Sequence, residues 1–334
     1  MKDPVTGYDY PPSWVNACKN EESLQLVSLG LAVLMSDGNI LRRGFTTGTT
    51  AAAACKSAVL SLKEPVSSVK IKLPCDLAFD VKATGIDGLG RAWKYSGDYR
   101  NDITSNLLFE AKAEISKAGI EIIAGGGIGR FERDTPRYKK GNPAISKTSM
   151  SSIKNAVKEA AEEIGIEGVK VFLTVPLGES VGKKTLNPQV GVLGGISVLG
   201  STGLVEPWDD HLTESAIERI KGSQRVVLTT GRVGLRYSRI MFPEHEVILV
   251  GKYLEKAIDV ASGEIIVCGL PALILKFIKP DILEGKGFKT VEEMSMSSEW
   301  QNIVYDVLLD YKKEKSYVRV ILVNRDGDIV GDSK

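Results

Sequence analysis

Histidine is almost absent from this chain, which has only two histidines among 334 residues. His211 and His245 are too few to build a histidine-based metal centre. The four cysteines are also sparse and lie far apart: Cys18, Cys55, Cys75 and Cys268. None belongs to a Cys-x-x-Cys pair, which argues against a zinc ribbon or a thioredoxin-like motif. We therefore expect no resident metal, and thiols that stay reduced.

The chain also lacks an excess of charge of either sign. Its 43 Lys and Arg residues balance 42 Asp and Glu residues, for a net charge of +1. This balance excludes a generally basic nucleic-acid binder. The first twelve residues have no apolar core and form no signal peptide, and the apolar stretch 24–35 is shorter than the roughly 20 residues of a membrane span. We expect a cytoplasmic protein that binds neither nucleic acid nor membranes, with its oligomeric state left open.

Glycine, in contrast, is abundant. The chain has 34 glycines but only 13 prolines, and its glycine share exceeds the usual value of roughly 7%. There is no Gly-X-Y period, so the excess is not collagen-like. It points to tight turns and close backbone approaches in a folded chain.

The first half of the chain has the pattern of an α+β domain. An Asp-Gly pair between residues 29–35 and 39–41 predicts a β-hairpin, because Asp-Gly supplies the positive φ angles of a two-residue turn. Alternating apolar and polar residues predict strands at 69–73, 77–83 and 91–95. Helical patterns cover 49–63, 103–117 and 150–164. We expect an antiparallel sheet with helices on one side.

From Gly168 onward the predicted strands are nearly all apolar: 169–175, 226–229, 247–250, 265–268 and 318–323. Helical patterns lie between them, near 210–221, 252–262 and 299–313. Buried strands that alternate with helices are typical of a doubly wound parallel sheet. We therefore predict an N-terminal extension with a hairpin (1–40), an α+β domain (41–165) and a Rossmann-like α/β domain (166–334).

Two arginines precede a helix start that is rich in threonine. The motif is Leu-Arg-Arg-Gly-Phe-Thr-Thr-Gly-Thr at 41–49, and alanines follow at 51–54. Backbone N–H groups at a helix start, together with the helix dipole, bind carboxylates or phosphates well. The alternative is a threonine N-cap on a helix that packs closely through its alanine face. On this motif alone, the capping interpretation is favoured.

A second glycine-rich block covers residues 178–203. Gly178 to Lys183 is one residue shorter than a P-loop, and a second lysine stands where a P-loop has Ser or Thr. No stretch matches the Gly-x-Gly-x-x-Gly fingerprint, so an ATPase or a standard dehydrogenase is disfavoured. The block follows the first apolar strand, which is where doubly wound sheets place ligand loops. Turns alone account poorly for five glycines within residues 191–203.

A third motif has three glycines at 125–127 and a basic segment at 130–140. It is either a solvated face or an anion-binding loop. Two carboxylates, Asp98 and Asp102, precede the helix predicted at 103–117. Capping of that helix is the favoured role for Asp102, and Asp98 is a candidate general base.

Three blocks resemble the CbiD family, the cobalt-precorrin-5B (C-1)-methyltransferases of anaerobic cobalamin biosynthesis. They are the motif at 41–49, Lys-Lys-Thr-Leu-Asn-Pro at 183–188, and the glycine-rich run from Gly194 to Pro207. The resemblance extends over about residues 41–280. It implies methylation of carbon 1 of a cobalt-containing tetrapyrrole by S-adenosylmethionine, which yields cobalt-precorrin-6A. The cobalt belongs to the substrate.

The implied substrate carries several carboxylates around a flat apolar ring, so its pocket needs many hydrogen-bond donors. We assign substrate binding to the helix start and to the lysine pair with its following asparagine: Arg42, Arg43, Thr46, Thr47, Thr49, Lys183, Lys184 and Asn187. We assign the methyl donor to the glycine loop: Gly194, Gly195, Ser197, Gly200, Thr202 and Gly203. In this hypothesis the helix start faces the substrate across a cleft between the domains.

The chain departs from the family pattern at several places: Thr50, residues 99–105, Gly126, Ser146 and the region beyond Gly269. These departures support a second hypothesis, in which the protein is a non-catalytic carrier or scaffold for tetrapyrroles. The intact block at 183–207 argues against it.

Overall fold

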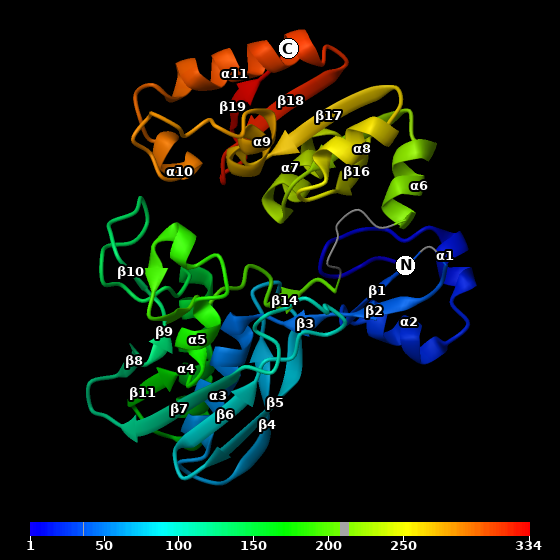
Figure 1. Cartoon of the computed structure of the whole chain (residues 1–334). Helices are drawn as coiled ribbons and strands as arrows, with labels where there is room; N and C mark the ends of the chain where they lie inside the picture. Colours follow the sequence, from blue (N-terminus) through cyan, green and yellow to red (C-terminus); the bar gives the residue numbers. More distant parts are fainter. Residues whose placement is uncertain (36, 208–213) are drawn as a thin grey trace. The chain divides into compact units, whose positions relative to one another are not determined.

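The computed structural model describes residues 1–35, 37–207 and 214–334. It divides the chain into two compact units, Met1–Asp209 and Asp210–Lys334 (Figure 1). The helix predicted over 210–221 therefore begins outside the described residues, where His211 also lies. Its described part is α6, Glu214–Gly222.

A six-stranded sheet forms the framework of the first unit. Its strands are β4 (Val66–Lys72), β5 (Ala78–Ile86), β6 (Leu89–Trp93), β7 (Leu108–Ile115), β11 (Val169–Thr174) and β8 (Ile120–Ala124), in that spatial order. All neighbours are antiparallel except β11 and β8. Buried and exposed residues alternate along β5 and β6, so this part of the sheet has one face in the core and one in solvent.

Helix α3 (Thr47–Leu60) lies in the core of the first unit, and all fourteen of its residues are buried. The alanines at 51–54 give it a narrow surface that contacts both the sheet and α4 (Lys147–Ile164). Helix α4 is amphipathic: Ile153, Val157 and Ala160 are buried while its charged residues face outward. The helices predicted at 49–63 and 150–164 are confirmed.

Residues 1–42 add a small cluster of their own to the first unit. It contains α1 (Pro12–Ala17), α2 (Glu21–Ser28) and the antiparallel pair β1 (Ala32–Leu34) and β2 (Ile40–Arg42). The predicted hairpin is therefore confirmed. Tyr10, Val27 and Leu34 are buried in this cluster.

Short elements complete the first unit. They are β3 (Gly44–Phe45), β9 (Gly127–Ile128), β10 (Arg130–Phe131), α5 (Gly178–Gly182), the 3-10 turn η1 (Pro188–Val190), β12 (Val192–Leu193), β13 (Gly195–Ile196) and β14 (Leu204–Val205). Three pairs link them: β14 with β3, β13 with β9, and β10 with β12. These pairs join the motifs at 41–49, 125–130 and 178–205 into one region.

The second unit contains a five-stranded sheet in the order β16-β15-β17-β18-β19. Its strands are β15 (Arg225–Thr229), β16 (Glu246–Leu249), β17 (Glu264–Gly269), β18 (Val318–Val323) and β19 (Ile329–Asp332). The first four are parallel, and β19 runs antiparallel to β18. The chain is thus a mixed α/β protein with a mostly antiparallel sheet followed by a mostly parallel one, as predicted.

Helices cover both faces of this second sheet. Helix α7 (Arg232–Met241) packs through Leu235 and Met241 against Val227 and Ile266. The other face carries α8 (Leu254–Val260), α9 (Pro271–Ile278), α10 (Val291–Met294) and α11 (Trp300–Glu314). Strands that are buried on two faces must be apolar throughout, which explains their sequences.

Three predictions are wrong: the sheet to which one strand belongs, the domain boundary and one helix. The apolar strand predicted at 169–175 is β11, which lies between β7 and β8 in the first sheet and does not open the second one. The predicted boundary at residue 165 therefore cuts through the first unit, and the structure divides the chain at 209/210. Most of the helix predicted at 103–117 is in fact strand β7.

No helix in the described part of the chain is long and apolar enough to cross a bilayer. Among the same residues, no group of three or more His, Cys, Asp or Glu side chains is arranged to hold a metal ion.

Candidate functional site

The start of α3 and the second half of the glycine-rich block are hydrogen-bonded to each other. The Thr47 hydroxyl accepts the backbone N–H of Leu199 at 2.8 Å, and the Gly48 N–H donates to the Leu199 carbonyl at 2.9 Å. The Thr49 hydroxyl donates to the Gly203 carbonyl at 2.7 Å. The two motifs that the sequence analysis placed in different domains therefore lie together in one unit.

These contacts occupy the donors of the helix start. The Thr46 hydroxyl caps the helix by accepting the Thr49 N–H at 3.3 Å, and the Thr50 hydroxyl donates to the Thr46 carbonyl. Thr47 and Thr49 are only 8% and 3% exposed. The capping interpretation is therefore correct for this motif. The assignment of Thr46, Thr47 and Thr49 to substrate binding is not supported, because their hydroxyls already bond the chain itself. Thr46 accepts from the Thr49 N–H, and Thr47 and Thr49 donate to backbone carbonyls.

Several glycines bring three backbone segments into direct contact. A Cβ on Gly127 would lie 1.8 Å from the Val175 carbonyl oxygen, and one on Gly195 would lie 2.2 Å from the Gly127 oxygen. A Cβ on Gly182 would lie 2.3 Å from the Gly195 oxygen. Elements β9, β13 and α5 can therefore pack only with glycine at these positions. Gly195 is buried by protein, which argues against its assignment to the methyl donor.

Polar side chains hold the same block in place. The Asn187 amide donates to the Gly195 carbonyl at 3.0 Å, and the Ser197 hydroxyl donates to the Asn187 side-chain oxygen at 2.9 Å. The Thr202 hydroxyl bonds the backbone of Leu204 through both its N–H and its carbonyl. Asn187, Ser197 and Thr202 thus stabilise the loop, a role that their assignment to ligands did not anticipate.

The other three glycines of the loop differ in their surroundings. A Cβ on Gly200 would lie 2.4 Å from the Thr46 hydroxyl, and one on Gly203 would lie 2.9 Å from Leu73. Gly194 is exposed, and nothing lies within 4 Å of the place its Cβ would take. Of the glycines assigned to the methyl donor, only Gly194 faces open space.

Large apolar side chains are exposed along this block. They are Leu177 (64% exposed), Leu186 (70%), Val190 (44%), Leu193 (43%) and Leu199 (54%). Lys183 and Lys184 are exposed among them in the sequence, and the Lys183 ammonium lies 3.0 Å from Glu179. We call these seven residues the 177–199 surface. Exposed apolar groups and exposed cations within one stretch of chain suit a flat apolar ligand with anionic substituents.

Asp98 is held beside Arg42. Its carboxylate accepts the backbone N–H of Arg42 at 2.7 Å, and its own N–H donates to the Arg42 carbonyl at 3.0 Å. Both residues are exposed, so the Arg42 side chain can reach solvent. The geometry leaves the role of Asp98 as a base to be tested.

Asp102, in contrast, has a structural role. It forms an ion pair with the ammonium of Lys94, whose side chain is 3% exposed. It also accepts hydrogen bonds from the Ser96 hydroxyl at 2.8 Å and from the Thr104 N–H at 2.9 Å. Burial would raise the pKa of Asp102, but the hydrogen bond from Lys94 holds it below its usual value. Asp102 caps a turn, as predicted, but strand β7 follows the turn instead of a helix.

Comparisons with known proteins agree with the motifs. The model of the CbiD family matches residues 35–207, which is more than half of the chain. The chain belongs to the CbiD family. The match begins directly after β1, within the hairpin, and ends next to Glu206, so it covers most of the first unit and the whole of the glycine-rich block.

Full-length relatives carry one description. A protein of Methanoculleus marisnigri is 51% identical over 335 residues, covers 99% of both chains and is described as cobalt-precorrin-5B C(1)-methyltransferase. A protein of Methanospirillum hungatei with the same description is 51% identical over the whole of both chains. The crystal structure of a cobalamin biosynthesis protein (cbiD) from Archaeoglobus fulgidus is 32% identical, with a TM-score of 0.74, and covers 97% of this chain and 100% of that one.

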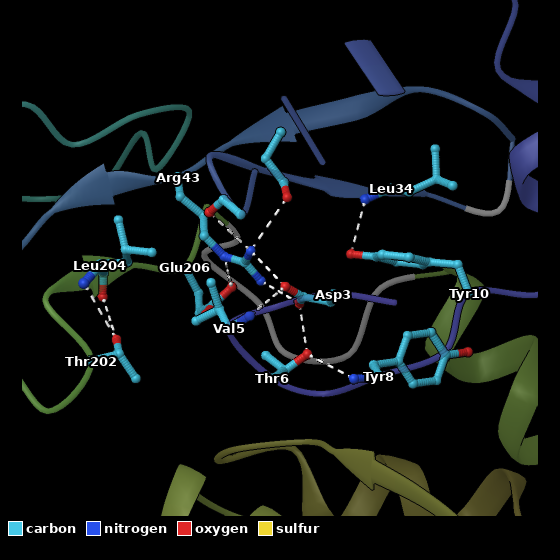
Figure 2. A network of polar contacts seen from close by, with 12 residues as sticks. Asp3, Val5, Thr6, Tyr8, Tyr10, Leu34, Arg43, Thr202, Leu204 and Glu206 are labelled. Carbon is cyan, nitrogen blue, oxygen red and sulfur yellow. Dashed lines mark hydrogen bonds and ion pairs between the residues drawn. The ribbon is translucent and has the colours of Figure 1, made fainter. Parts of the chain in front are cut away.

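In this CbiD protein, Arg43 is the centre of a buried network (Figure 2). Its guanidinium donates to both carboxylate oxygens of Asp3, at 3.0 and 2.6 Å, and to Glu206 at 3.1 Å. It also donates to the carbonyls of Gly30 and Ala32. The Arg43 side chain is 0% exposed and its donors are occupied within the chain, which argues against its assignment to substrate binding.

The network joins three parts of the CbiD chain that are distant in sequence. Burial alone would raise the pKa of Asp3, but Arg43 holds it below its ordinary value. Burial alone would lower the pKa of Arg43, and the charges of Glu206 and Asp3 raise it instead. Sequence reasoning missed Asp3 and Glu206, because neither stands in a recognisable spacing with Arg43. The network fixes the N-terminal residues to the first unit.

Proposed function

We propose that this protein is an enzyme that transfers a methyl group from S-adenosylmethionine to carbon 1 of cobalt-precorrin-5B. The product would be cobalt-precorrin-6A, an intermediate of anaerobic cobalamin biosynthesis. The observation that carries the proposal is the 51% identity, over nearly the full length, to relatives described as cobalt-precorrin-5B C(1)-methyltransferase. Identity of this extent covers both units, including the second one, which the family model does not reach.

The 177–199 surface is our proposed binding site for the tetrapyrrole. Its exposed leucines offer an apolar face to the ring, and Lys183 and Lys184 offer charged donors to the ring carboxylates. The exposed side chain of Arg42 is a further candidate for a carboxylate. Each charge-assisted hydrogen bond of this kind contributes on the order of 1.5–3 kcal/mol.

The proposed methyl transfer needs no covalent intermediate with a residue of the protein. The electron-rich carbon of the macrocycle is the nucleophile, and S-adenosylmethionine supplies the electrophilic methyl group. The residues mainly have to hold the two molecules in line, and positioning of this kind is worth roughly 7–11 kcal/mol of the barrier. Asp98 remains our proposed acceptor for a proton that leaves the substrate, since its carboxylate is exposed.

One assay separates the enzyme from a non-catalytic carrier. The protein is incubated with cobalt-precorrin-5B and S-adenosylmethionine labelled in the methyl group, and the tetrapyrrole is analysed by mass spectrometry. The enzyme yields a tetrapyrrole heavier by one labelled methyl group, in an amount that grows with repeated turnover. A carrier yields a bound but unmodified tetrapyrrole, which would contradict the proposal.

A double variant tests the proposed tetrapyrrole site. Lys183→Ala with Lys184→Ala should raise the KM for the tetrapyrrole roughly tenfold or more, because two cations are lost. The affinity for S-adenosylmethionine should stay the same. Lys112→Ala is the matched control, since Lys112 is a similarly exposed lysine on β7 that also pairs with a glutamate. Equal effects of the double variant on both ligands would refute this placement.

A further inference from the structure

The second unit contains a cavity that the sequence analysis did not find. Its volume is about 520 Å³, which lies within the usual range of small-molecule sites. Leu270 follows the last residue of β17, and Asn324 follows the last residue of β18. The cavity therefore opens at the carboxyl ends of two neighbouring parallel strands. In open α/β sheets this is the edge where ligands bind.

The order of the strands also favours this edge. The chain passes from β15 to β16 on one side, and then crosses over to β17 on the other side of β15. The loops after β15 and β17 therefore leave the sheet in opposite directions, and Leu270 lies in the second of these loops. The described second unit thus has the arrangement of a Rossmann-like sheet, and the cavity lies at the carboxyl ends of β17 and β18, on the β17 side of the crossover.

The walls of the cavity are apolar, while its polar groups carry both signs of charge. Leu270, Met296, Trp300 and Val330 line it. Trp300 is only 6% exposed, so its ring is held firmly by the core. An aromatic ring beside aliphatic groups is a suitable surface for a purine base.

Two opposite charges lie at this cavity. The Arg325 guanidinium is 3.9 Å from a carboxylate oxygen of Glu292, and their side chains are 55% and 40% exposed. An ion pair this long and this exposed contributes little to stability. A ligand with a carboxylate and an ammonium group can bind both partners: its carboxylate pairs with Arg325 and its ammonium group pairs with Glu292.

We infer that this cavity binds the methyl donor of the proposed reaction, an adenosyl sulfonium with an amino-acid group. The inference rests on the proposed function for the identity of the ligand. The purine lies against the wall formed by Trp300 and Met296. The amino-acid carboxylate binds Arg325, and the ammonium group binds Glu292. Apart from Gly194, the glycines of the loop first assigned to the donor are packed against the chain itself, whereas this cavity has room for the donor.

The test measures binding, not turnover. Isothermal calorimetry with S-adenosylhomocysteine, which keeps both the purine and the amino-acid group, is carried out on the full chain and on Arg325→Ala and Glu292→Gln. Each variant should weaken binding at least tenfold, because one charged contact is lost. Arg225→Ala is the matched control: Arg225 is the first residue of β15, at the opposite edge of the sheet, and pairs with Glu244 and Glu264. The affinity of Arg225→Ala for S-adenosylhomocysteine should equal that of the unmodified protein.

A second ligand makes the assignment of the charges specific. Decarboxylated S-adenosylmethionine lacks the group that Arg325 binds, so it should bind Arg325→Ala and the unmodified protein equally well. It should still lose affinity in Glu292→Gln. Loss of both ligands to the same extent in Arg325→Ala would overturn the assignment, because it would mean that the substitution disturbs the cavity in general.

The outcomes also distinguish the site from the function. If the variants bind S-adenosylhomocysteine like the unmodified protein while methyl transfer to cobalt-precorrin-5B is observed, the donor binds elsewhere and the proposed function stands. If the unmodified protein binds neither adenosyl compound and yields no methylated tetrapyrrole, both proposals are wrong.

Discussion

Replacement of Arg43 by alanine should destabilise the first unit strongly, even though no ligand is involved. The substitution removes hydrogen bonds to Asp3, to Glu206 and to two backbone carbonyls. It takes the arginine partner away from the carboxylates of Asp3 and Glu206, which are only 2% and 9% exposed. Removal of one partner from a buried ion pair costs about 3–5 kcal/mol. We expect a loss of this size in the free energy of unfolding at pH 7.

The neighbouring residue provides the control. Arg42→Ala removes the same kind of side chain one position earlier, where it is exposed. Substitutions at such surface positions usually change stability by less than about 0.5 kcal/mol. Urea unfolding followed by circular dichroism gives both values. Limited trypsin digestion shows whether the N-terminal residues, which Asp3 attaches to Arg43, become accessible first in Arg43→Ala. Equal stability of the two variants would refute the structural role of the network.

The same network predicts a dependence on pH. Because the pKa of Asp3 is lower in the folded protein than its unfolded value of about 3.9, its contribution is fully present above the unfolded pKa. The contribution disappears as the pH falls through the folded pKa. Asp3→Asn should therefore be less stable than the unmodified protein at pH 7, and the difference should shrink below about pH 4. A difference that stays constant down to pH 2 would contradict this account.

Two further substitutions test other buried contacts by urea unfolding. Gly127→Ala should destabilise the protein by several kcal/mol more than Gly194→Ala. Both glycines have a φ of +76°, and this backbone conformation costs about 1–2 kcal/mol for alanine. Only at Gly127 would the new Cβ lie 1.8 Å from a carbonyl oxygen. Similar losses would show that the backbones around Gly127 can move apart. Asp102→Asn should cost about 3 kcal/mol at pH 7, because Lys94 is left buried without its counter-ion. Because the pKa of Asp102 is lowered in the folded protein, this loss of stability should diminish below about pH 4. An Asp102→Asn variant as stable as the unmodified protein at pH 7 would contradict a stabilising role for the Lys94–Asp102 pair.

Local patterns in the sequence predicted most individual elements. Strands β4 and β5 show the alternation of a half-exposed sheet, and the β1–β2 hairpin has an Asp-Gly turn between its strands. These signals are carried by neighbouring residues, so they can be found without knowledge of the fold. Strand β7 was missed because its sequence, Leu-Phe-Glu-Ala-Lys-Ala-Glu-Ile, contains good helix formers. Its alternation is nevertheless real, since Phe109, Ala111 and Ala113 are buried in turn.

Partners distant in sequence could not be predicted in the same way. The apolar composition of β11 shows that the strand is buried, but not which strands bury it. Its place between β7 and β8 is decided by pairing with residues more than forty positions away, and the predicted boundary between the domains was wrong for this reason. The Asp3 and Glu206 contacts of Arg43 are of the same kind, since they span 40 and 163 residues.

The residues of the binding site were difficult to predict for a related reason. A sequence shows which side chains can donate hydrogen bonds, but it does not show which acceptors they bond in the folded chain. Thr47, Thr49 and Asn187 are good ligands for carboxylates in principle, but each bonds a carbonyl of the chain. The motif that led to the CbiD family is therefore mostly a motif of packing. Few residues other than glycine would allow α5, β9 and β13 to approach so closely. Contacts to a ligand must come from side chains that this packing leaves outside, and the exposed Leu186 and Lys184 lie within the same motif. The glycine-rich block thus builds a rigid support, and the groups that we propose for recognition of the substrate, Lys183 and Lys184 with the exposed leucines, lie on its outer surface.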